Sequence, residues 1–160
     1  MRRFLLPFAC SSVLPRAGGR EEAYSHLLPD DFFTDEQVQG RHQMWNHLLG
    51  NKREERCIRI AESDEQIIGF AFTGPSVGAD GQEPQRNRQL FSLYVAARHH
   101  GTSVGQALLD AMAGDGPTVL WVAKGNPRAT AFYLRNGFQF DGAEQTDPSA
   151  PKIVDARAVR

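Results

Sequence analysis

Apolar and polar residues alternate along a short run in the middle of the chain, at residues 57–61, and a second run at 66–73 is rich in Ile and Phe. A period of two is typical of β-strands, because successive side chains of a strand point to opposite faces of the sheet. The polar stretch 62–65 separates the two runs. It predicts a turn, so the two strands should form an antiparallel hairpin. The polar segment 74–88 contains glycine and proline and predicts a long loop.

From residue 89 onward the strand period and the helix period alternate. Strands are expected at 89–95, 118–122, 138–143 and 152–159, and helices at 104–113 and 127–136. The first of these helices has apolar residues three and four positions apart, and the second has proline near its start and Gly137 at its end. Strands that alternate with helices favour parallel pairing, so the sequence predicts an α/β (α+β) chain with a mixed central sheet flanked by helices.

The N-terminal part of the chain shows weaker patterns. A short helix is expected over 21–28, stopped by Pro29, and a second helix begins at Thr34, with Gln37 as its capping-box partner. The apolar face of the second helix consists of Val38, Trp45, Leu48 and Leu49. Residues 1–19 contain two prolines and no clean period, so any strand there should be reduced.

Length and composition are those of an ordinary globular protein. The 160 residues favour a single domain over 1–160, and 41% apolar with 23% charged residues fit that class. With a formal net charge of −1, the chain lacks the excess of positive charge that binds a phosphate backbone, so nucleic acid is not an expected partner. No apolar stretch approaches the ~20 residues that span a bilayer, so a membrane is not expected either.

The first residues resemble a secretory signal only loosely, because Pro7 interrupts a short apolar run. We therefore expect a cytoplasmic protein. The two cysteines, Cys10 and Cys57, are too few for a disulfide framework and are expected to be small buried apolar residues.

The segment 93–109 carries the first chemical signal. A strand leads into the small-residue loop His100-Gly101-Thr102-Ser103, and the loop opens a helix at Val104. The start of a helix presents unpaired N–H groups and positive potential, which suit a phosphate or pyrophosphate. Gly101 and Gly105 let the backbone approach such a ligand closely. Ser103 can cap the helix with Gln106 as its capping-box partner, or its hydroxyl can donate to a phosphate oxygen. The spacing fits neither a P-loop nor a dinucleotide fingerprint.

The second signal is the segment Asn126-Pro127-Arg128-Ala129-Thr130-Ala131-Phe132-Tyr133-Leu134-Arg135-Asn136-Gly137-Phe138. Its order N-x-x-A-x-x-F-Y-x-x-x-G-F, about twenty residues after a strand–loop–helix, resembles the GNAT acetyltransferases. Residues 100–105 resemble the pyrophosphate motif of that superfamily, Q/R-x-x-G-x-G/A. His100 departs from the usual Gln or Arg, and Ser103 departs from a usual glycine, which puts the strength of cofactor binding in question.

The resemblance implies a GNAT-like fold and acetyl-coenzyme A as the cosubstrate. It implies that the pantetheine arm lies between two splayed parallel strands and bonds to free backbone groups, with the N–H of Val95 on the thioester carbonyl. Asn126 would hold the cofactor, and Tyr133 would protonate the leaving thiolate. The implied cofactor-binding residues are Leu93, Tyr94, Val95, His100, Gly101, Thr102, Ser103, Val104, Gly105, Gln106 and Asn126. The acetyl group would pass directly to a primary amine of a small molecule or protein.

The protonation step is chemically reasonable. The reference pKa of a tyrosine hydroxyl is about 10 and that of a thiol about 8.5, so a developing thiolate can take the proton with help from the site. The acceptor amine must lose a proton, and no spacing selects a base among Glu62, Gln89 and the histidines. The sequence also does not identify the acceptor. A homodimer is compatible with the sequence.

Structural alternatives exist for each of these residues. Tyr133 can pack in the core with Phe132, and Asn126 can cap the helix that begins at Pro127. Arg128 and Arg135 are expected to be solvated helix residues, with contact to the cofactor's phosphates as the alternative. His99-His100 without a third ligand is a poor metal site, so no metal is expected and the pair should be a solvated loop pair near the phosphate. The alternative function is a non-enzymatic, degenerate module that binds acyl-coenzyme A or a protein partner.

Overall fold

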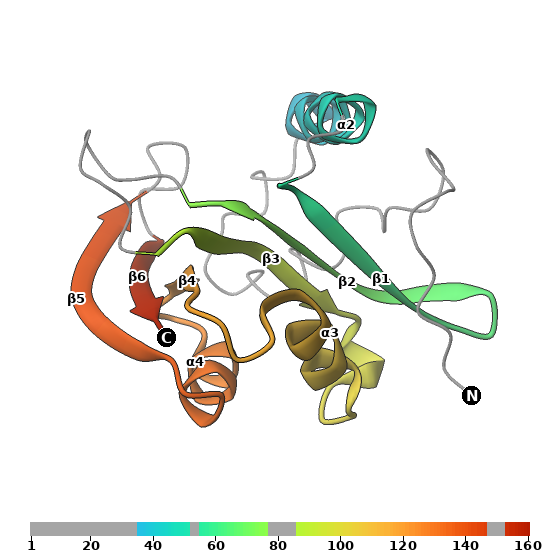
Figure 1. Cartoon of the computed structure of the whole chain (residues 1–160). Helices are drawn as coiled ribbons and strands as arrows, with labels where there is room; N and C mark the ends of the chain where they lie inside the picture. Colours follow the sequence, from blue (N-terminus) through green and yellow to red (C-terminus); the bar gives the residue numbers. More distant parts are fainter. Residues whose placement is uncertain (1–34, 52–54, 77–85, 147–152) are drawn as a thin grey trace.

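The computed structural model describes residues 35–51, 55–76, 86–146 and 153–160. Its elements are α2 (Asp35–Gly50), β1 (Cys57–Ser63), β2 (Gln66–Pro75), β3 (Arg88–Val95), the 3₁₀ helix η1 (Ala97–His99), α3 (Val104–Ala113), β4 (Val119–Ala123), α4 (Pro127–Arg135), β5 (Gln139–Thr146) and β6 (Val154–Val159). The strands form one six-stranded sheet in the order β1-β2-β3-β4-β6-β5 (Figure 1). The predicted mixed sheet with flanking helices is confirmed.

Strands β1 and β2 form the predicted antiparallel hairpin, with register from Cys57↔Thr73 to Ser63↔Gln66. The turn is shorter than the polar stretch 62–65 suggested, since only Asp64 and Glu65 lie outside the ladder. Both have positive φ, at 50° and 61°. Two central residues with positive φ match the right-handed twist of a two-residue hairpin.

Strand β2 continues into a second antiparallel ladder with β3, which reaches Pro75↔Arg88. The N–H of Ser76 also donates to the carbonyl of Asn87, at 3.1 Å. The predicted loop 74–88 is therefore too long at both ends, because the strands extend into it. Proline is tolerated at the end of a strand, where its missing N–H removes little from the ladder.

Helix α3 connects β3 to the parallel strand β4, as the alternation of strand and helix predicted. Helix α4 then leads to β5. The last strand, β6, lies between β4 and β5 and is antiparallel to both.

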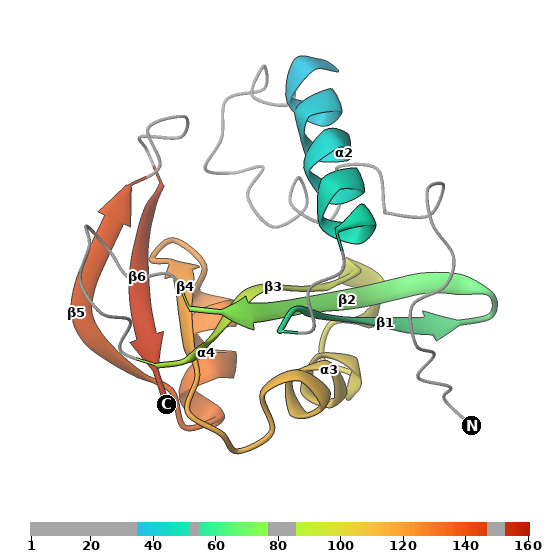
Figure 2. The same cartoon turned by 45° about the horizontal axis from the view of Figure 1, so that its top comes forward.

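Helices cover both faces of the sheet (Figure 2). Helix α2 lies on one face, where Trp45 meets Phe70 and Phe72 of β2 edge-on at 5.6 and 6.0 Å between ring centroids. Trp45, Leu48 and Leu49 are half-buried, which agrees with the apolar face expected for this helix. Helices α3 and α4 lie on the opposite face.

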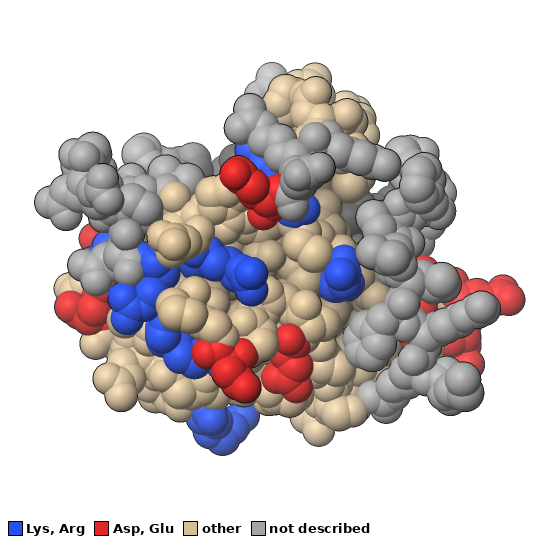
Figure 3. Space-filling view, in the orientation of Figure 1, with Lys and Arg blue, Asp and Glu red and all other residues tan. Residues whose placement is uncertain are grey.

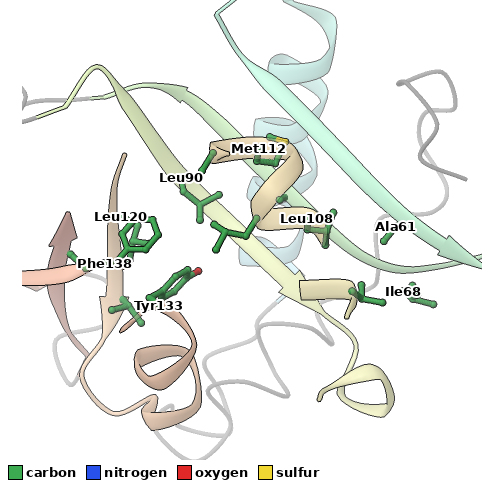
Figure 4. Packing of buried hydrophobic residues seen from close by; sticks show 14 residues of the cluster. Ala61, Ile68, Leu90, Leu108, Met112, Leu120, Tyr133 and Phe138 are labelled. Carbon is green, nitrogen blue, oxygen red and sulfur yellow. The ribbon is translucent and has the colours of Figure 1, made fainter. Parts of the chain in front are cut away.

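The main core lies between the sheet and the helices α3 and α4 (Figure 4). Its largest fully buried side chains are Phe138, Leu108, Leu109, Leu120 and Thr118. Burial of each large apolar side chain contributes roughly 1.5–3 kcal/mol to folding. Cys57 packs against this core as a partly buried free thiol, as expected for a small apolar residue.

Arg160 joins the C-terminal ends of α3 and α4. Its Nη1 donates to the carbonyl of Asn136 at 3.0 Å, and its Nη2 donates to the carbonyl of Gly114. The guanidinium also lies 4.6 Å above the ring of Phe138. A cation suits the last carbonyls of two helices, because they carry the negative end of each macrodipole. Figure 3 shows Lys and Arg gathered on this side, over the start of β3 and the end of β6.

Several expectations fall outside the described residues. They are the helix over 21–28, the N-cap at Thr34, the atypical segment 1–19 and the environment of Cys10. Among the described residues, no helix is long and apolar enough to cross a membrane.

Candidate active site

Strands β3 and β4 are paired over a very short distance and then separate. The parallel register covers only Gln89↔Val119 and Leu90↔Leu120. At this point β3 has a bulge, because Leu90 faces Thr73 while Ser92 faces Phe72, which leaves Phe91 as an extra residue. A bulge bends its strand and increases the local twist. A pocket of about 460 Å³ lies along the separated strands.

The backbone of β3 directs groups that the ladder with β2 leaves unpaired toward this pocket. The N–H of Ala96 donates to the carbonyl of Ile68 at 2.9 Å, so the next pair in the ladder, Gly69↔Val95, is not hydrogen-bonded. In an antiparallel ladder, bonded and non-bonded pairs alternate. The N–H and C=O groups of Val95 and Leu93 therefore point away from β2, toward the side that β4 has left.

The backbone of β4 presents unpaired groups from the other side. Thr118 and Arg160 exchange both backbone hydrogen bonds, and the N–H of Lys124 donates to Val154. The same alternation along β4 and β6 leaves the N–H and C=O of Trp121 directed toward β3. Two strand edges thus face each other across the pocket, and an extended amide-containing ligand could bond to both.

The start of α3 forms one end of the pocket. The first intrahelical bond runs from the N–H of Ala107 to the carbonyl of Ser103, so the N–H groups of Gly105 and Gln106 precede it. Gly101 has φ of 73°, which favours glycine and turns the loop into the helix. The Oγ1 of Thr102 accepts a long hydrogen bond of 3.4 Å from the N–H of Val104.

The capping box predicted at Ser103 is wrong. Ser103 is at the N-cap position, but its side chain makes no capping hydrogen bond. Its backbone, with φ −73° and ψ 0°, is helical, whereas a capping side chain requires an extended backbone. The Nε2 of Gln106 instead donates to Asp110 at 2.8 Å and to Asn136 at 2.7 Å.

Gly105 keeps the pocket open where the first turn of α3 approaches β3 and α4. A Cβ at this position would lie 3.7 Å from Cγ2 of Val95 and 3.8 Å from Cε2 of Phe132. These distances are ordinary contacts, so a side chain would fit without a clash but would fill the space between them. The missing Cβ leaves that space to a ligand.

His100 is half-buried rather than solvated, which corrects the expectation of an exposed histidine pair. Its Nε2 lies 2.8 Å from the carbonyl oxygen of Val95. A carbonyl only accepts, so Nε2 carries the proton and donates. The imidazole therefore ties the loop before α3 to the end of β3 and uses the outward-facing carbonyl of Val95.

Asn126 caps α4, as the structural alternative proposed. Its Oδ1 accepts from the N–H of Ala129 at 3.0 Å, and Pro127 follows at the first helical position. Asn126 also lines the pocket. The cap uses the side-chain oxygen, and the Nδ2 carries two further donors.

Tyr133 belongs both to the core and to the pocket. Its ring is 8% exposed and meets Phe132 and Phe138 edge-on, at 5.3 and 5.6 Å between centroids. It also lines the pocket, and Figure 4 shows its hydroxyl directed away from α4 toward β3. Packing therefore fixes the ring, while the hydroxyl lies at the pocket wall.

The structure brings the sequence-predicted residues together with several that the sequence did not single out. All the implied cofactor residues except Ser103 and Val104 line the pocket, and so does Tyr133. The lining residues also include Phe91, Ser92 and Trp121, which the sequence did not single out, and Phe132, Arg128 and Arg135, for which it favoured a structural role. The last three are spaced i, i+4 and i+7, so helical spacing alone could have placed them on one face of α4. The described residues contain no cluster of His, Cys, Asp or Glu that could hold a metal ion.

Comparison with known proteins agrees with this architecture. Residues 21–138 match the model of the acetyltransferase (GNAT) family. A probable N-acetyltransferase of Mycobacterium tuberculosis is 35% identical over 94 residues, which cover 57% of this chain and 51% of that protein. An uncharacterized N-acetyltransferase of Mycobacterium bovis is 33% identical over 93 residues, covering 54% of this chain and 55% of that protein. The matched region thus spans about half the length of these relatives.

Solved structures share the fold at low identity. The PaiA N-acetyltransferase of Thermoplasma acidophilum, in complex with coenzyme A, has a TM-score of 0.62 and 18% identity, and the match covers 89% of this chain and 86% of that chain. The ribosomal-protein-alanine N-acetyltransferase of Brucella melitensis has a TM-score of 0.62 and 19% identity, with 89% and 88% covered. The family match extends over more than half of the sequence and includes both strands and both helices around the pocket. The chain therefore belongs to the acetyltransferase (GNAT) family.

Proposed function

We propose that this chain transfers an acetyl group from acetyl-coenzyme A directly to a primary amine. The observation that carries the proposal is the separation of β3 and β4 after Leu90↔Leu120, which leaves two unpaired strand edges facing one pocket. The pantetheine arm contains two amides and can bond to such edges as a strand would. The volume of about 460 Å³ is in the range of small-molecule sites.

The ends of the pocket suit the two ends of the cofactor. The N–H groups of Gly105 and Gln106 at the start of α3 suit the pyrophosphate, since a helix N-terminus attracts anions. Arg128 and Arg135 line the same pocket and add positive charge. The side chain of Asn126 can donate to the cofactor through Nδ2 while its Oδ1 caps α4.

Two groups act on the reacting atoms. The N–H of Val95 points into the pocket and donates to the thioester carbonyl oxygen, where negative charge develops during attack by the amine. His100 fixes the adjacent peptide, between Val95 and Ala96, through its bond to the Val95 carbonyl. The hydroxyl of Tyr133 donates its proton to the leaving sulfur.

The first test separates binding from chemistry. Coenzyme A should raise the melting temperature of the protein, and acetyl-coenzyme A with an amine panel should release free thiol. Tyr133→Phe should lower kcat by about 100-fold or more, because general acid catalysis contributes at least that much. The variant should keep the coenzyme A-induced shift, since the phenyl ring preserves the packing on Phe132 and Phe138.

The same experiment discriminates the alternatives. Absence of a thermal shift with coenzyme A would remove the cofactor assignment. Full turnover by Tyr133→Phe would remove its role as acid. Binding of acetyl-coenzyme A without thiol release over a broad amine panel would favour a non-enzymatic acyl-coenzyme A-binding module.

A further inference from the structure

Residues whose side chains point to both faces of the sheet line the pocket. Leu93 and Val95 pack against the core on the α3 side, so Tyr94 between them points to the opposite face. Trp121 likewise alternates with two core residues of β4. Tyr94 and Trp121 thus line the same pocket as the start of α3.

Aromatic rings on β3 form one wall of the pocket on the α2 face. Phe91 is 40% exposed and stacks on Phe72 at 5.2 Å between centroids, with 25° between the ring planes. Tyr94 stacks on Phe70 in the same way, at 5.2 Å and 30°. Each outer ring is therefore backed by an inner ring, and Trp45 of α2 packs edge-on against both inner rings.

Phe91 is held in this position by the backbone beneath it. A Cβ on Gly74 would lie 3.3 Å from Cε2 of Phe91, so the glycine makes room for the ring. The bulge places Phe91 and Ser92 together opposite Phe72. An exposed ring that is fixed by a bulge, a glycine and a stacked neighbour is pre-organised for contact with a ligand.

Trp121 of β4 forms the other wall. Its indole has the guanidinium of Arg157 at 5.6 Å from the ring centroid, and Arg157 is opposite Trp121 in the β6 ladder. The Nε of Arg157 also pairs with Asp141 at 2.7 Å. Trp121 follows the last parallel pair, Leu90↔Leu120, as Phe91 does on β3, and both residues line the pocket. The space between Phe91 and Trp121 is named the aromatic slot below.

The lining residues restrict what the slot can hold. Among the described lining residues there is no aspartate or glutamate, and the carboxylate of Asp141 is already paired with Arg157. A ligand with several ammonium groups would find no counter-charge there. A single amine on an apolar body brings one charge and lets the body pack favourably against the rings.

We propose that the acetyl acceptor is a monoamine carried by an aromatic or flat apolar body, which binds in the aromatic slot between Phe91 and Trp121. This assignment rests on the proposed acetyl transfer, because it names the acceptor for that reaction. The rings select the body of the acceptor, and the amino group reaches the thioester through the gap in the sheet.

Calorimetry on the protein saturated with coenzyme A tests the slot without turnover. The probes are 2-phenylethylamine, 2-cyclohexylethylamine and spermidine. We expect 2-phenylethylamine to bind more tightly than the other two. Spermidine bound equally or more tightly, or no binding of 2-phenylethylamine, would overturn the proposal.

Two variants locate the binding. Phe91→Leu should weaken the binding of 2-phenylethylamine by about threefold to tenfold, which is the range that one aromatic contact provides. Trp121→Leu should weaken its binding by the same factor. Phe140→Leu is the matched control, because Phe140 is also 40% exposed but lies on β5 and does not line the pocket. An equal effect of Phe91→Leu and Phe140→Leu would overturn the slot.

Failure of the slot and failure of acetyl transfer give different results. A coenzyme A thermal shift with thiol release that prefers spermidine would leave acetyl transfer intact and overturn the slot. No thermal shift with coenzyme A, but binding of 2-phenylethylamine that depends on Phe91, would overturn acetyl transfer and support the slot as a binding site.

Discussion

At Gly69 of β2, the neighbouring strand β3 leaves no room for a side chain. A Cβ added there would lie 2.7 Å from the carbonyl oxygen of Tyr94 and 3.2 Å from Cδ1 of Leu108. The first neighbour is backbone and cannot rotate away. Gly69→Ala therefore requires the two strands to separate by several tenths of an ångström, at the residue pair that includes Val95.

The cost follows from this geometry. Forcing an extra methyl group into a packed site costs roughly 1–3 kcal/mol. For a chain of this size each kcal/mol lowers the melting temperature by about 2–4 °C, so the expected decrease is about 2–12 °C. The displacement also moves the peptide of Val95, so the thermal shift produced by coenzyme A should become smaller. Calorimetric or fluorescence melting, with and without coenzyme A, measures both effects.

Gly40→Ala provides the matched control. Gly40 lies within α2, and a Cβ there would have no heavy atom within 4 Å. The same substitution should stabilise the helix by about 0.5–1 kcal/mol and leave the response to coenzyme A unchanged. A Gly69→Ala variant as stable as the wild type would refute the reasoning from close approach.

Substitutions at three further positions test other features of the structure. Arg160→Met keeps an aliphatic side chain near Phe138 but removes the donors to the carbonyls of Gly114 and Asn136. It should lower the free energy of unfolding, measured by urea denaturation, by about 2 kcal/mol. An unchanged free energy would show that water replaces the guanidinium. Glu65→Gly relieves a positive φ of 61° and should stabilise the protein by about 0.5–1 kcal/mol, whereas a lower melting temperature would contradict the strain. Asn126→Ala removes the cap of α4 and should lower the free energy of unfolding by about 1 kcal/mol, whereas Asn126→Asp should restore it. If Nδ2 holds the cofactor, the aspartate variant should still bind coenzyme A more weakly in calorimetry, and equal affinity would exclude that role.

The parts of the fold that the sequence predicted well have strong local periodicity. Helix α3 spans the predicted residues 104–113, because its apolar side chains recur at helical spacing and face the core. The β1–β2 hairpin and the parallel connection through α3 follow from alternation and from element order. Strand ends were less accurate at 62–65 and 74–88, since polar residues on an exposed edge do not distinguish strand from loop.

The parts of the site that the sequence did not predict depend on tertiary geometry. Phe91 reaches the pocket because a bulge rotates it, and Trp121 because β4 separates from β3, and neither event changes the pattern of apolar residues. Ser103 has the side chain of a cap but a helical backbone, which only the structure shows. The bond from His100 to Val95 joins residues five apart through the turn η1 and has no spacing rule.

Because β6 lies between β4 and β5, local unfolding of β6 affects the strand β4 that lines the pocket. Among the described strands, β5 pairs only with β6, and β6 also forms the ladder that orients the backbone of Trp121. Any opening that releases β6 from β4 therefore releases β5 with it, so amide protons in β5 should exchange with solvent at least as fast as those in β6. The same opening frees one edge of the pocket, and a ligand held along that edge should slow hydrogen exchange across both strands.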